Sequence, residues 1–168
     1  MKHSNDIGNN DIRNDHIRGN QAPSTHILND LVAATRDGKS FYEHATTKVR
    51  SPELKALFVR LAKVKGEIVG DLSDEIRASG DPPTNTGTWS GDFNRFYTGI
   101  RAHLGDKTYA YVAQLEESEE QLLKAFDRAL NDEDISAHAH AVLTRLMPEV
   151  RSCHDIMRAQ KIALKKAA

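Results

Sequence analysis

Apolar residues recur every three or four positions over four long stretches of the chain, which is the pattern of amphipathic α-helices. The stretches cover residues 25–49, 52–79, 106–131 and 134–165. In the second stretch the apolar positions are Leu54, Leu57, Leu61, Val64, Ile68, Leu72 and Ile76. A helix of about 25 residues is roughly 37 Å long, so the pattern predicts an all-α bundle of four long helices.

The connections between these stretches predict the topology of the bundle. The turn between the first two helices is short. Ser51 suits the N-cap of the second helix, and Pro52 suits its first helical position. Such a short turn forces an antiparallel hairpin. The next connection, residues 80–105, is far longer than the roughly 2–8 residues that join neighbouring helices in bundles. We therefore expect a ferritin-like four-helix bundle, with a long crossover between its second and third helices.

The crossover contains aromatic and apolar residues at helical spacing, which predicts a short extra helix. These residues are Trp89, Phe93, Phe96, Tyr97 and Ile100. If they form an exposed patch, they indicate an interface with a partner. If they cover the end of the bundle, they are simply part of the core.

Residues 1–24 differ in composition from the rest of the chain. They are crowded with Asn, Asp and Gly and are nearly free of apolar residues. We expect a disordered polar N-terminal arm, followed by one bundle domain over residues 25–168. The arm lacks the apolar run of a secretory signal peptide.

Charge and cysteine content narrow the functions that the bundle can serve. The chain of 168 residues has 23 Lys plus Arg and 24 Asp plus Glu, a formal net charge of −1. This balance predicts neither nucleic acid nor an anionic membrane as a partner. Cys153 is the only cysteine, which excludes an internal disulfide and any site built from several cysteines. We expect a cytoplasmic protein whose partner is a second copy or another protein.

Several segments resemble one protein family in the order in which they occur. They are LNDL (28–31), DGKSFYEHA (37–45), SPELKALF (51–58), EESEEQLLKAF (116–126) and His154-Asp155. They resemble the bacterial DUF2383 family of four-helix-bundle proteins, which is related to the ferritin-like superfamily. The resemblance covers about residues 25–161 and implies a fold. Because the function of that family is unknown, it implies no substrate and no reaction.

Ferritin-like di-iron proteins bind two metals through one Glu from each of two helices and a Glu-x-x-His from each of the other two. This chain lacks that motif. Gly70 stands where a histidine should follow Glu67, and Glu149 and His154 are five residues apart. No Glu-x-x-His occurs in the predicted helices. The full di-iron motif is therefore absent.

A reduced metal site remains an alternative. Counting from the turns places Glu43 and His154 at similar heights, where they could form a hydrogen bond or bind one metal. Glu116 aligns with Glu149, either as two solvated carboxylates or around a metal. With Glu119, the candidate ligands for iron or another divalent metal are Glu43, Glu116, Glu119 and His154.

Glu119 occupies a position in an otherwise apolar seam and should point inward. The other members of the seam are Val112, Leu115, Leu122 and Phe126. An isolated buried carboxylate is costly, so Glu119 needs a partner. Lys65 lies at the same height near the apolar face of the second helix. We therefore expect a buried Lys65–Glu119 ion pair, with its positive charge where a second metal would otherwise sit.

Two functional hypotheses follow. The first is a non-catalytic structural or interaction module, with stress physiology as its setting. No catalytic or cofactor-binding residue is assigned, because no Ser-His-Asp or Cys-His arrangement, phosphate loop or dinucleotide fingerprint occurs. The second is a metal-binding protein, iron being the expected metal, with an incomplete di-iron-type site.

Overall fold

The computed structural model describes residues 23–84, 92–102 and 104–167, and every regular element in these ranges is an α-helix. The helices are α2 (Pro23–Lys48), α3 (Pro52–Ala78), α4 (Asp92–Ala102), α5 (Lys107–Leu130) and α6 (Ala137–Ala167). The predicted all-α architecture is confirmed, and the bounds of the four long helices differ from the predicted ones by at most three residues. Most of the predicted arm lies outside the described residues, but Pro23 and Ser24 already belong to α2.

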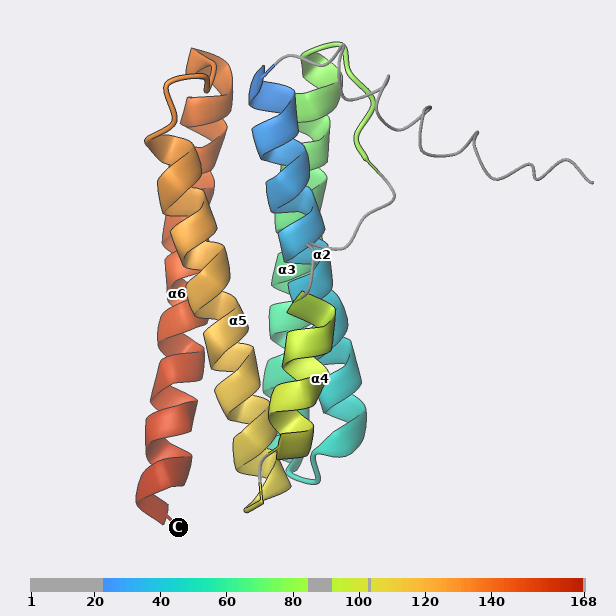
Figure 1. Cartoon of the computed structure of the whole chain (residues 1–168), viewed down its shortest axis with the longest axis vertical. Coiled ribbons are helices and arrows are strands. Elements are labelled where there is room, and N and C mark those ends of the chain that lie inside the picture. The colour runs from blue at the N-terminus through green and yellow to red at the C-terminus, as the bar shows by residue number, and fades with distance from the viewer. Residues whose placement is uncertain (1–22, 85–91, 103, 168) are drawn as a thin grey trace, which may run out of the picture.

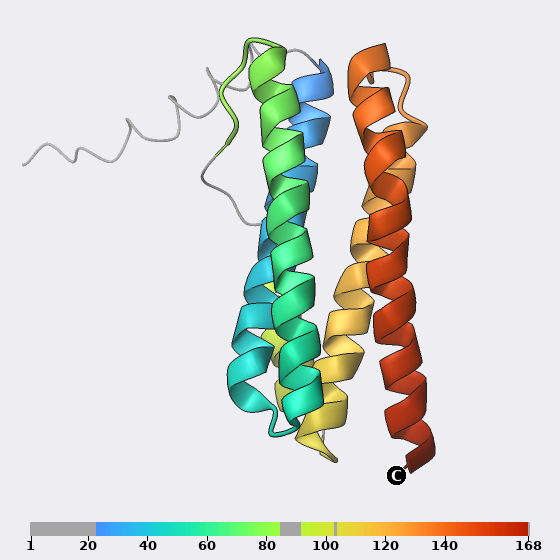
Figure 2. The ribbon, with the colours of Figure 1, turned by 180° about the vertical axis from the view of Figure 1, so that it is seen from behind.

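The four long helices form two antiparallel hairpins, α2 with α3 and α5 with α6 (Figure 1). The chain leaves α3 at one end of the bundle and enters α5 at the other, so these two helices run parallel. The view from behind shows the same arrangement (Figure 2). The long crossover is therefore confirmed, and a plain up-down-up-down bundle is excluded. The short helix α4 lies on this crossover and packs against α5 and α2.

Capping residues and a glycine mark the ends of two of the long helices. The N–H of Leu54 donates to the Ser51 side chain at 3.2 Å, and the N–H of Thr108 donates to Asp106 at 2.8 Å. These contacts satisfy backbone donors that the first turns of α3 and α5 leave unpaired. Gly80 follows α3 with φ of 89°, a left-handed conformation that favours glycine after a helix.

The start of α2 is tied to both of the turns at its end of the bundle. Ser24 Oγ donates to the carbonyl of Asp134 at 2.9 Å and accepts from the N–H of Ser136 at 2.6 Å. Thr25 donates to Asp81 Oδ2 at 2.7 Å. The bonds of Ser24 connect the two hairpins at one end, and the bond of Thr25 fastens the exit of α3 to the start of α2.

The residues of α4 complete the core at the other end. Phe96 is 3% exposed and stacks on Phe41 with ring centroids 4.1 Å apart, and Ile100 is also buried. These two crossover residues are therefore core. Trp89 and the side chains of Phe93 and Tyr97 lie outside the described part of the structure.

Candidate functional site

A pair of charged side chains divides the hydrophobic core into two clusters. On α3, Lys65 lies between Leu61, which belongs to one cluster, and Ile68, which belongs to the other. On α5, Glu119 has the same position between Leu115 and Leu122. Because α3 and α5 run parallel, the two charged residues meet at the centre of the bundle. We call Lys65, Glu119 and the adjoining Tyr42 the buried charged layer.

The geometry of this layer satisfies the carboxylate on both oxygens. Lys65 Nζ donates to Glu119 Oε2 at 2.5 Å, and Tyr42 OH donates to Glu119 Oε1 at 2.7 Å. The side chains of Lys65 and Glu119 are only 1% and 2% exposed. The predicted ion pair is confirmed. The Tyr42 hydroxyl was not predicted, although Tyr42 lies on the apolar face of α2 at this height.

The surroundings keep the neighbouring side chains protonated. Burial raises the pKa of Tyr42 well above its ordinary value, and the charge and hydrogen bond of Glu119 raise it further. Tyr42 is therefore a neutral donor. Burial also raises the pKa of Cys153 to about 11, an effect that the Lys65 ammonium partly offsets. Cys153 is thus a buried thiol rather than a reactive thiolate.

The structure does not bring Glu43 and His154 to one place. Glu43 forms an exposed ion pair with Lys39 at 2.9 Å and lines a shallow hollow on the outer face of α2 and α3. His154 lines a different hollow between α5 and α6, and its Nδ1 lies 3.2 Å from Asp155 Oδ1.

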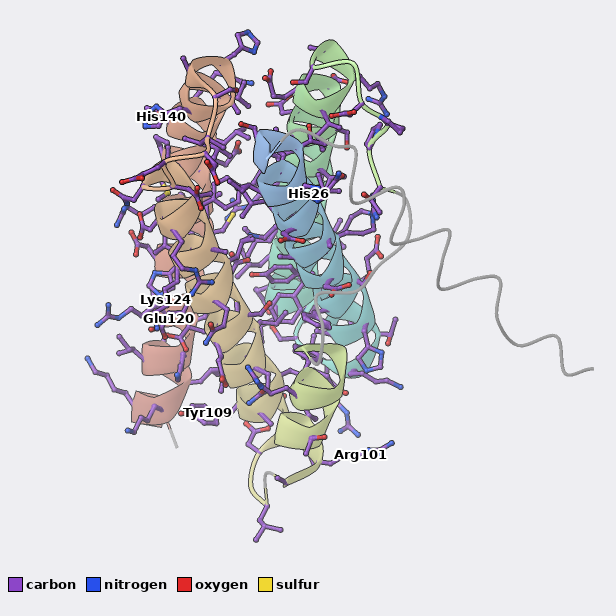
Figure 3. The ribbon with its side chains drawn as sticks, turned by 45° about the horizontal axis from the view of Figure 1, so that its top comes forward. His26, Arg101, Tyr109, Glu120, Lys124 and His140 are labelled. Atoms are coloured by element: carbon purple, nitrogen blue, oxygen red, sulfur yellow. The ribbon has the colours of Figure 1, made fainter. Side chains whose placement is uncertain are left out.

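Glu116 and His154, in contrast, line the same hollow of about 430 Å³. Glu116 is buried and pairs with Lys161 at 2.6 Å, while Glu149, its expected neighbour, is exposed. Glu120 also lines the hollow and pairs with Lys124 at 2.7 Å. Figure 3 shows Glu120 and Lys124 beside each other on the outer side of α5. Glu116 and Glu120 therefore both have cationic partners in this hollow.

No three His, Cys, Asp or Glu side chains among the described residues are arranged to hold a metal ion. All buried side-chain nitrogen and oxygen atoms in the same ranges have hydrogen-bond partners. Nor does any helix in the described ranges combine the length and apolar character needed to cross a membrane.

Another buried carboxylate, that of Glu75, was not predicted from the sequence. Glu75 on α3 is 4% exposed at its side chain, and His138 Nδ1 from α6 lies 2.7 Å from its Oε2 and 2.8 Å from its Oε1. Arg145 and Asp71 form another link between these helices at 2.9 Å. The signal for Glu75 was present, because it lies three residues after Leu72 on the buried side of α3.

Fold and site together define an all-α bundle whose core is split by a buried charged layer. The family described as "Domain of unknown function (DUF2383)" matches residues 24–132, more than half of the chain. The chain therefore belongs to the DUF2383 family, as the resemblance indicated. The match extends from the start of α2 through α5 and stops before α6. No curated protein matches the chain.

Proposed function

We propose that this protein is a non-catalytic structural or interaction module that acts through self-association or a protein partner. The observation that supports this most directly is the ammonium group of Lys65 at the bundle centre. In a ferritin-like metal protein, the inward-facing carboxylates of this region bind two cations. Here Glu119 is satisfied by Lys65 and Tyr42 instead.

The donor set does not fit a di-iron centre. A divalent cation beside Glu119 would face the Lys65 ammonium at short range, where like charges repel strongly in a low-dielectric interior. Glu116 already has a cationic partner in Lys161, and Glu43 is 56% exposed at its side chain. The sequence supplies no Glu-x-x-His in any of these helices. These features favour a core built for structure over one built for metal chemistry.

A metal-binding function is the alternative, and one observation favours it. Glu116 and His154 line one hollow between α5 and α6 together with Glu120. Carboxylate and imidazole are suitable ligands for iron and similar divalent metals. Such a site would require Lys161 to leave Glu116, with which it pairs at 2.6 Å. We propose this as a reduced site and not as a di-iron centre.

Two measurements distinguish these proposals. Protein purified without an affinity tag should contain no stoichiometric metal and should not bind Fe(II) in a titration. Sedimentation velocity should show a dimer or larger species whose share rises with concentration. Stoichiometric metal that is lost in Glu116→Ala and His154→Ala would contradict the structural proposal.

Matched variants separate ligation from general effects of mutation. His140→Ala removes an exposed imidazole of α6 and serves as the control for His154→Ala. Glu67→Ala is the control for Glu43→Ala, because the two side chains are 57% and 56% exposed and each pairs with a lysine four residues away. Metal binding that depends on Glu116 and His154 but not on His140 would support the metal-binding alternative, whereas Glu43→Ala and Glu67→Ala should both leave it unchanged.

A further inference from the structure

The near-zero net charge of the chain hides a separation of charge along the bundle. One end is formed by the α2–α3 turn, the end of α4, the start of α5 and the end of α6 (Figure 1). The opposite end holds the end of α3, the α5–α6 turn and the start of α2. Charge at the two ends has opposite sign.

The first end, which we call the basic end, comprises residues 48–55, 99–102, 104–107 and 162–167. It carries seven basic side chains against Glu53 and Asp106, a net charge of +5. All seven are exposed. They are Lys48, Arg50, Lys55, Arg101, Lys107, Lys165 and Lys166. Figure 3 shows Arg101 at this end of α4.

The opposite end, which we call the acidic end, comprises residues 23–26, 74–81 and 127–138. Its seven acidic side chains against Arg77 and Arg128 give a net charge of −5. Its acidic residues include the exposed run Asp132-Glu133-Asp134 in the α5–α6 turn. The bundle is therefore an electrostatic dipole along its long axis.

The preference of helix termini for charges that oppose the helix dipole explains only part of this separation. Basic residues are favourable at helix C-termini, which accounts for Lys48, Arg101 and the lysines at the end of α6. Lys55 and Lys107, however, lie in the first turns of α3 and α5, where a cation is unfavourable. Asp127 lies near the C-terminus of α5, where an anion is unfavourable. These placements point to a role for the charge outside the helices themselves.

The basic end also carries protruding apolar side chains. Leu104 is fully exposed between α4 and α5, and Ile162 near the end of α6 is 46% exposed. The described part of the acidic end has no exposed large hydrophobic residue. Exposed cations and a projecting leucine at the same end of the bundle match the two components of an anionic lipid bilayer, its headgroups and its acyl boundary.

The geometry points to the basic end as a docking surface for an anionic phospholipid membrane. This inference goes beyond the proposed function, because it adds an anionic lipid surface to the self-association or protein partner proposed above. Lys165, Lys166 and their neighbours would contact headgroup phosphates and carboxylates, and Leu104 would enter the interface. The acidic end would be repelled, so the bundle axis would stand away from the membrane plane. A nucleic acid would satisfy the cations but would leave Leu104 without an apolar partner.

Vesicle flotation tests this inference on the full chain. We expect binding to vesicles of phosphatidylcholine mixed with phosphatidylserine and none to phosphatidylcholine alone. Each basic residue at an anionic surface strengthens partitioning roughly fivefold, so Lys165→Ala with Lys166→Ala should weaken it about 25-fold. High salt should abolish binding because it screens exposed charges.

The matched control is Lys63→Ala with Lys124→Ala. These lysines are 78% and 54% exposed on the sides of the bundle, and their removal changes the net charge equally. We expect less than about a twofold effect on partitioning. Leu104→Ala should weaken binding about tenfold through lost apolar contact. Circular dichroism would verify that each variant is folded.

Equal losses in the two lysine pairs, or equal binding to both kinds of vesicle, would overturn the inference. Tighter binding to duplex DNA or RNA than to vesicles would also overturn it. The inference would also be overturned if the protein formed salt-sensitive end-to-end oligomers that require both Lys165 and Asp132. In that case the basic end binds the acidic end of another copy. None of these results depends on metal content, so the failure of membrane docking is distinguishable from the failure of the proposed function.

Discussion

The buried charged layer makes a quantitative prediction about stability. Lys65→Met replaces the ammonium with an apolar side chain of similar length and leaves the buried Glu119 carboxyl with Tyr42 as its remaining hydrogen-bond donor. The Glu119 side chain is 2% exposed, so water does not replace the lost partner. Removal of one member of a buried ion pair costs about 3–5 kcal/mol of unfolding free energy. For a domain of this size, the loss corresponds to a fall of roughly 6–20 °C in Tm.

Replacing the whole layer should have a different effect. In the triple variant Tyr42→Phe, Lys65→Met, Glu119→Leu, no charge or hydroxyl is left buried without a partner. Exchanges of buried ion pairs for apolar side chains range from neutral to about 4 kcal/mol stabilising. We therefore expect the triple variant to be at least as stable as the natural protein and clearly more stable than Lys65→Met alone.

Urea unfolding followed by far-UV circular dichroism measures both effects. Lys63→Met is the control on the same helix, because Lys63 forms an exposed pair with Glu67 at 3.7 Å. Such pairs contribute about 0–1 kcal/mol. A loss below about 1 kcal/mol in Lys65→Met would refute the argument that Glu119 depends on a desolvated cation. So would a triple variant less stable than the single one.

Four further predictions concern single residues elsewhere in the bundle. Gly38→Ala should stabilise the protein by about 0.5–1 kcal/mol, since the added Cβ meets only atoms at ordinary contact distances of 3.9 and 4.0 Å and helix interiors favour alanine. Gly80→Ala should instead destabilise the protein by about 1–2 kcal/mol, because the backbone φ is +89° there. The urea midpoint measures both effects. A lower midpoint for Gly38→Ala or a higher midpoint for Gly80→Ala would contradict the reasoning. Cys153 has a pKa raised from 9.0 to about 11, so the folded state retains the thiol proton longer and stability should fall as pH rises from 9 to 11. That part of the fall should vanish in Cys153→Ala, and the native thiol should resist Ellman's reagent at neutral pH. Finally, His138→Ala should cost about 1–3 kcal/mol by leaving the buried Glu75 carboxylate without its imidazole partner, and an unchanged urea midpoint would show that Glu75 is solvated.

Much of the fold could be predicted because the positions of the helices follow from the spacing of apolar residues, and the topology follows from the lengths of the connections. Helix bounds followed from long apolar repeats, and the crossover followed from the length of residues 80–105. The Lys65–Glu119 pair was predictable for the same reason. Height along a bundle follows from counting residues at a rise of about 1.5 Å each, and both residues interrupt apolar seams.

Other parts of the site could not be predicted because they depend on how each helix is rotated about its axis. Glu43 and His154 were matched by height, but their side chains line hollows on different helix pairs. The hydrogen bond of the Tyr42 hydroxyl could not be predicted either, because burial of its aromatic ring is enough to explain a tyrosine on the apolar face of a helix. Its acceptor becomes known only when α2 and α5 are placed together. The pairing of His138 with Glu75 depends likewise on how α3 and α6 meet.

The connection of the hairpins through the buried charged layer has a consequence for folding kinetics. Lys65 and Glu119 are 54 residues apart and belong to different hairpins, whereas each hairpin has its own local contacts. Their charges lose water only when the hairpins dock. That docking step therefore carries a desolvation barrier before the ion pair forms. We expect the layer to slow the final assembly of the bundle, so that the apolar triple variant folds faster than the natural chain.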